Sequence, residues 1–182
     1  MGNDSGNGGR PSAKQIQLNK QITAARDAKD ILAIVEAAHG DFNAVNAATA
    51  CSRLAKTHRG SAQGPCKADA SVQQLLCTVT RVAPSMNAQN VANTIWGLAT
   101  LGWQAAQGEG AMRGALEGAA VRVAPSMNAQ DVANTIWGLA TLGWQSGEGM
   151  MRGALEGAAV RVAPSMNPQE VANIIWGLAT LG

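Results

Sequence analysis

The stretch RVAPSMNAQDVANTIWGLATLGWQ, residues 122–145, decides the fold because the chain contains three versions of it. The earlier copy, residues 81–104, differs from it only by Asn90 in place of Asp131, and a shorter copy starts at residue 161. The tryptophans that mark the copies are 41 and 39 residues apart, at Trp96, Trp137 and Trp176. A period of this length is typical of stacked helical or strand repeats.

Each copy is expected to form two helices. In residues 111–123 of the third unit, apolar side chains recur at helical spacing, at Met112, Leu116, Ala119 and Val123. Pro125 ends this helix, because the residue before a proline is pushed out of the helical region. Asn128 then caps a second helix that runs to about Leu142, where Gly143 supplies a left-handed C-terminal residue. The inward stripe of the second helix is Val132, Ile136 and Leu139.

These pairs of helices predict an all-α fold, an α-solenoid of four two-helix repeats of about 39–44 residues within residues 21–182. The expected units are about 21–60, 68–104, 109–145 and 148–182. The first is divergent: DFNAVNAATACSRLAK, residues 41–56, aligns with residues 85–100 but carries Ser52 at the tryptophan position. Residues 1–20, rich in Gly, Asn and Ser, are interpreted as a disordered lead-in.

The sequence stops directly after a helix, which suggests a fragment truncated at its C-terminal end. A last repeat without a polar cap leaves one apolar face uncovered. We therefore expect the chain to be marginally stable or to self-associate through the Trp176 end. A monomer whose sedimentation is independent of concentration in analytical ultracentrifugation would contradict this expectation.

The repeated tryptophan lies almost opposite the inward stripe. On a helical wheel Trp137 is a neighbour of Gln130, Asn134 and Thr141. The favoured interpretation places these tryptophans in the core between repeats, and the alternative makes them platforms on which nucleotide bases stack. The glycine after each tryptophan lowers helix propensity, so we expect close approach of neighbouring helix backbones at Gly97, Gly138 and Gly177.

Composition and charge exclude several classes of protein. A hydrophobic content of 46% excludes a wholly disordered chain, and no apolar run approaches the roughly 20 residues of a membrane span. Residues 81–182 hold five Lys/Arg against six Asp/Glu, so the repeats themselves are not basic. This balance counts against a strong affinity driven by phosphate contacts alone.

No catalytic or metal-binding motif is found in the sequence. Cys51, Cys66 and Cys77 form no CxxC pair, and His39 and His58 belong to no cluster with metal-ligand spacing. We therefore expect neither an enzyme nor a bound metal or cofactor. No secretory or organellar targeting segment is visible.

The motif N-x-Q-x-V-A-N-T-I-W-G-L-A-T-L-G, following a helix that ends in proline, resembles the octotricopeptide-type repeats of algal organellar RNA-maturation and translation factors. It is also similar to the repeats of FAST kinase-like and RAP-domain proteins. The resemblance covers residues 18–182, although no RAP domain is present. It implies a right-handed solenoid that binds single-stranded RNA in a mitochondrion or chloroplast and acts in RNA processing, stability or translation.

Polar residues that recur in every full unit are then the candidates for RNA contact, because Asn and Gln suit base edges and Arg suits phosphate. They are Arg81, Arg122 and Arg161; Gln89, Gln130 and Gln169; and Asn93, Asn134 and Asn173. A column that varies between units, and so suits sequence reading, is Asn90, Asp131 and Glu170. Alternatively, the asparagines tie adjacent repeats together as buried amides and the arginines are solvated. The competing function is a protein-protein interaction scaffold that binds no RNA.

Overall fold

The computed structural model describes residues 10–58, 69–103, 110–144 and 149–181, and within these ranges it contains helices and no strand. The α-helices are α1 (Ala13–Ala24), α2 (Ala28–Ala38), α3 (Ala44–His58), α4 (Ala70–Val82), α5 (Ala88–Thr100), α6 (Gly110–Val123), α7 (Ala129–Thr141), α8 (Met150–Val162) and α9 (Pro168–Leu181). Short 3-10 turns are η1 (His39–Asp41), η2 (Ala83–Ser85), η3 (Ala124–Ser126) and η4 (Ala163–Ser165). The predicted all-α solenoid is confirmed.

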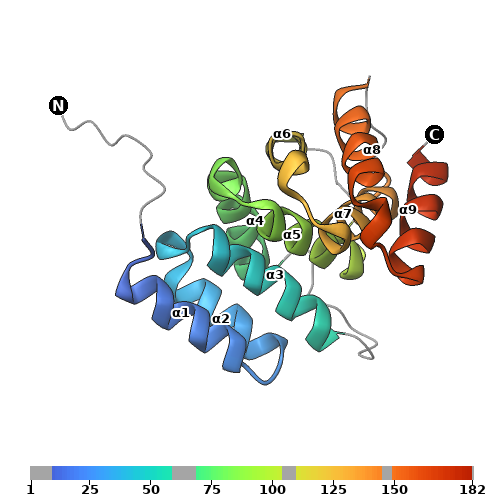
Figure 1. The fold of residues 1–182 in the computed structure, drawn as a ribbon. Coiled ribbons are helices and arrows are strands. Elements are labelled where there is room, and N and C mark those ends of the chain that lie inside the picture. The colour runs from blue at the N-terminus through green and yellow to red at the C-terminus, as the bar shows by residue number, and fades with distance from the viewer. Residues whose placement is uncertain (1–9, 59–68, 104–109, 145–148, 182) are drawn as a thin grey trace.

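The helices form two layers. The even-numbered helices α2, α4, α6 and α8 contact one another in sequence and make up what we call the A layer. The odd-numbered helices α1, α3, α5, α7 and α9 do the same and make up the B layer. Figure 1 shows the helices succeeding one another from the blue N-terminal end to the red C-terminal end. Each repeat therefore contacts mainly its neighbours, as in other repeat proteins.

The B layer is the more closely packed of the two layers. A β-carbon added to Gly97 would lie 2.8 Å from the carbonyl carbon of Cys51, and one added to Gly138 would lie 2.7 Å from Cγ2 of Ile95. Gly177 approaches Ile136 in the same way. The expected close approach at these glycines is confirmed. Because the B helices are spaced more closely than the A helices, the stack curves toward its B side.

The first unit departs from this pattern. Arg53 stands where the later units have glycine, and its Nη2 atom donates a hydrogen bond to the carbonyl oxygen of Ala25 at 2.7 Å. Ala25 is the residue that ends α1. Helix α1 accordingly packs on α3 less closely than α3, α5, α7 and α9 pack on one another.

The interpretation of residues 1–20 as a disordered lead-in is wrong for its second half, because α1 begins at Ala13; residues 1–9 lie outside the described residues. Ser12 caps α1 through a hydrogen bond from the Gln15 backbone, and the Gln15 side chain accepts from the Ser12 backbone. Leu18 and Ile22 are buried. Composition concealed this helix, although the pattern Ser-x-x-Gln is a capping box that the sequence displays.

The caps of α7 follow the sequence prediction. Asn128 accepts a hydrogen bond from the Asp131 backbone at 2.8 Å, and Gly143 has φ of 66°. The Gly143 and Trp144 amides donate to the carbonyl oxygens of Ala140 and Leu139, which completes a Schellman motif. The predicted stripe of Val132, Ile136 and Leu139 is fully buried.

The second tryptophan of the repeat is a core residue that the helical stripes predicted from the sequence do not include. Trp103 and Trp144 follow the left-handed glycines and are only 4% and 1% exposed. The Schellman motif folds this residue back over the end of its own helix. Trp144 therefore belongs to the core, at a position where sequence periodicity alone would place a loop.

Candidate interaction face

Four side chains of each full repeat line the outward side of the B helices. Their spacing of four, three and four residues puts them on one side of a helix. We call this surface the polar-tryptophan face, and it consists of Gln89, Asn93, Trp96 and Thr100 on α5; Gln130, Asn134, Trp137 and Thr141 on α7; and Gln169, Asn173, Trp176 and Thr180 on α9. The three glutamines are exposed and the three asparagines are half-buried. The same four residue types thus recur in the same order along the stack.

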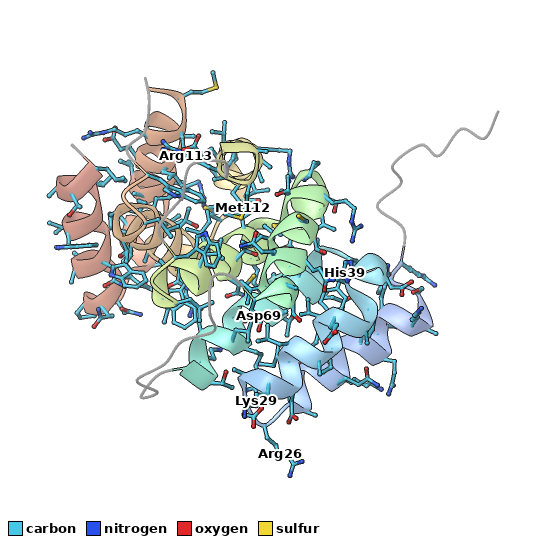
Figure 2. The ribbon with its side chains drawn as sticks, turned by 180° about the vertical axis from the view of Figure 1, so that it is seen from behind. Arg26, Lys29, His39, Asp69, Met112 and Arg113 are labelled. Carbon is cyan, nitrogen blue, oxygen red and sulfur yellow. The ribbon has the colours of Figure 1, made fainter. Side chains whose placement is uncertain are left out.

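The polar-tryptophan face carries no charged side chain. The ionisable residues of α5, α7 and α9 are Asp131 and Glu170 alone, and both bind the backbone at the start of their own helices. The A layer is different, because each of its helices carries charged residues. Figure 2 labels two of them, Lys29 of α2 and Arg113 of α6.

The candidate arginines bridge adjacent repeats. The Nη2 atom of Arg122 donates to the carbonyl oxygens of Ala83 and Met86 at 3.3 and 2.7 Å, and these two carbonyls belong to the turn between the helices of the preceding unit. Arg161 binds Ala124 and Met127 in the same way, and Arg81 binds His39 and Phe42. The structure therefore gives all three arginines a role in holding one repeat on the next.

Replacing Arg122 by alanine should lower the free energy of unfolding by about 1–2 kcal/mol. Hydrogen bonds to a charged group contribute about 1.5–3 kcal/mol, and partial exposure of this guanidinium reduces that figure. The control is Arg152→Ala, which removes a half-exposed i,i+4 pair with Glu156 and should cost only about 0.3–0.5 kcal/mol. Urea denaturation of both variants measures the difference. Equal losses would show that the two-carbonyl contact is not stabilising.

The variable column caps helices. The side chains of Asn90, Asp131 and Glu170 accept hydrogen bonds from the backbone amides of Asn87, Asn128 and Asn167 at 3.4, 3.3 and 2.9 Å. Asn46 does the same for Asn43 in the first unit. Asn90 and Asp131 are buried. Every residue in the column supplies an oxygen acceptor, so capping explains which residue types occur there without any reading of RNA.

The carboxyl group of Asp131 has its pKa raised above the ordinary value by burial, with the Asn128 backbone hydrogen bond opposing this change. Because the pKa is raised in the folded state, the charged carboxylate destabilises the folded protein relative to the unfolded chain. The contribution of Asp131 to the free energy of unfolding is therefore greatest at low pH and is lost as the pH rises through the pKa. Asp131→Asn should therefore stabilise the protein at neutral pH. The gain should disappear below the ordinary pKa of an aspartate.

Urea denaturation at neutral and acid pH tests this expectation. Asn90→Asp is the matched change in the preceding repeat and should destabilise the protein at neutral pH. If Asp131→Asn instead destabilises the protein at neutral pH, attraction between the carboxylate and the helix N-terminus outweighs its desolvation.

The marker tryptophans lie at the edge of the core. Trp96 and Trp137 are half-buried, whereas Trp176 is 48% exposed. On the same helix Val171 and Ile175 are exposed, although their counterparts in α5 and α7 are covered by the following helix. An uncovered apolar face was expected at this end, and self-association through it stays a prediction.

A groove of about 300 Å³ lies between α1 and α3. Its apolar walls are Ile16 and Val45, which are 46% and 43% exposed. Asn19 also lines it, with a buried Oδ1 atom that has no hydrogen-bond partner. Val45 aligns with Gln89 of the polar-tryptophan face, so the groove borders the extension of this face into the first unit. Sequence reasoning missed the groove because it placed α1 in the lead-in.

Two further features limit the chemistry of the described residues. Burial raises the pKa of Cys51 to about 12, which keeps its thiol protonated as a small core side chain. No group of three or more His, Cys, Asp and Glu side chains in the described ranges is placed to hold a metal ion.

Among the helices described, none is long and apolar enough to cross a membrane.

Comparison with known families supports the division of the chain into repeats. A family model described as "Protein of unknown function (DUF1601)" matches residues 72–95, 118–136 and 158–175. Each matched segment starts in an A-layer helix and ends in the B-layer helix that follows it. The curated proteins contain no match to this chain. The three matches thus lie one within each of the three full repeats.

Proposed function

We propose that this protein is an interaction scaffold that binds a protein partner on its polar-tryptophan face. The proposal rests on one observation: this face carries tryptophan side chains but no charged side chain. Tryptophan is enriched in protein interfaces and charged residues are depleted at their centres. The face also lies on the inner side of the curvature, where a partner contacts several repeats at once.

Single-stranded RNA is the second candidate ligand. It is favoured by the regular row of Trp96, Trp137 and Trp176, since bases stack on aromatic side chains with about 1–3 kcal/mol per base. The resemblance to organellar RNA-binding repeats points the same way. RNA also needs cations along its phosphates, and the arginines of these repeats already bind carbonyl groups.

Binding measurements at two salt concentrations separate the candidates. The probes are fluorescently labelled single-stranded RNA homopolymers, an RNA of mixed sequence, and short peptides selected from a random library displayed on phage. A scaffold should bind selected peptides with an affinity that changes little with salt. RNA binding that weakens steeply with salt, together with no recovered peptide, would overturn the proposal.

A further inference from the structure

The asparagine row has hydrogen-bonding capacity that the fold leaves unused. The side chains of Asn93 and Asn134 are half-buried and make no hydrogen bond to any other residue in the described ranges. Asn173 differs, since its Oδ1 accepts from Gln169 at 2.9 Å. A carboxamide donates and accepts at the same time, which matches the one N–H and one C=O of a peptide group. We infer that the polar-tryptophan face binds an extended polypeptide segment through its main chain; this inference rests on the proposed function.

Identity between repeats supports main-chain recognition. The same four residue types face outward on α5, α7 and α9, so the ligand should present the same polar groups at each repeat. The main chain of an extended polypeptide does this whatever its sequence is. A helical ligand does not, because its backbone groups already bond to one another. A nucleic acid repeats its phosphates, but this face offers them no cation.

The repeat spacing agrees with an extended chain. Packed helices lie about 8–10 Å apart, and glycine contacts place the B helices at the close end of such a range. Two residues of an extended polypeptide span about 6.6–6.8 Å. Curvature toward the B side brings the asparagines closer together than the helix axes. Every second peptide group can then meet one asparagine.

The groove between α1 and α3 supplies an apolar anchor at one end of this track. Its walls, Ile16 and Val45, suit an aliphatic or aromatic side chain of the bound segment. The buried Oδ1 of Asn19, which has no partner, is an acceptor for a main-chain N–H of the same segment. Lys20 also lines the groove and supplies one cation there.

The test uses the best-binding peptide from the phage selection and a series in which each of its backbone amides is methylated in turn. Methylation at every second residue should weaken binding about tenfold, because those N–H groups face the asparagines. Asn134→Ala should weaken binding of the unmodified peptide by a similar factor. Val45→Asp should remove the preference for an apolar residue at one end. Cys77→Ser, an exposed change on the A-layer helix α4, is the control and should leave affinity unchanged.

The outcomes distinguish the inference from the proposed function. Peptides that bind with no effect of backbone methylation or of Asn134→Ala would overturn main-chain recognition and leave the scaffold proposal standing. An unchanged end preference in Val45→Asp, with the protein still helical by circular dichroism, would overturn the anchor. Salt-sensitive RNA binding with no peptide binding would overturn both the inference and the proposed function.

Discussion

Trp144→Ala should lower the free energy of unfolding by about 3–5 kcal/mol, the range for truncating a buried aromatic side chain. Trp144 is 1% exposed, and it is held over its helix end by the Schellman motif. The loss combines the apolar area returned to water with the cavity left behind. Urea denaturation followed by circular dichroism measures it.

Trp137→Ala is the matched control for this change. It removes the same side chain from the same helical repeat, but from a half-buried position on the polar-tryptophan face. Its cost should be clearly smaller because less apolar surface is exposed and solvent fills the space. If Trp137→Ala cost more than Trp144→Ala, the marker tryptophan would be the one that stabilises the repeats.

Gly97→Ala should destabilise the protein by roughly 1–3 kcal/mol, the usual range for overpacking. The new methyl group would lie 2.8 Å from the carbonyl carbon and oxygen of Cys51 and 3.1 Å from the Ser52 amide nitrogen. These are backbone atoms, so no rotamer change relieves the clash and α3 and α5 must separate. Equilibrium unfolding in urea checks the loss.

Gly118→Ala provides a control with the opposite sign. Gly118 is an exposed glycine within α6, and no atom lies near an added β-carbon. The change should therefore stabilise the protein by up to about 1 kcal/mol through helix propensity. If both glycine variants were stabilised, the close approach between α3 and α5 would not constrain the fold.

Much of the fold could be predicted because its signals are local. A capping side chain such as Asn128 and a left-handed glycine such as Gly143 act within one helical turn, so the ends of α7 were placed from sequence. The close approach at Gly138 was also expected, since a mid-helix glycine needs compensation from packing.

The parts that were missed depend on contacts between distant residues. Trp144 is the exception, because the Schellman motif that folds it back over its own helix is local and the left-handed Gly143 indicates it. Helix α1 has few apolar residues, and its place is fixed by contacts such as the hydrogen bond from the Asn46 side chain to the Gln15 carbonyl oxygen, across 31 residues. The groove beside it was missed with it.

The candidate site was predicted in part. The wheel placed Trp137 beside Gln130 and Asn134, and the structure has all three on one surface. Variation between repeats favours RNA reading for the column Asn90, Asp131 and Glu170, but the structure gives these residues a capping role. Its members share an oxygen acceptor three residues after an asparagine, a pattern that already indicated capping.

Arg53 gives the order of the repeats a physical basis. A unit fits behind another only if it presents a glycine to the backbone of its neighbour, as α5, α7 and α9 do. The first unit presents a guanidinium there, which reaches the end of α1. Exchanging the first unit with an interior one would place that side chain where there is no space for it, so the four units are not interchangeable modules. An engineered array of this kind could gain length by copying interior units, with the first unit keeping its place beside α1.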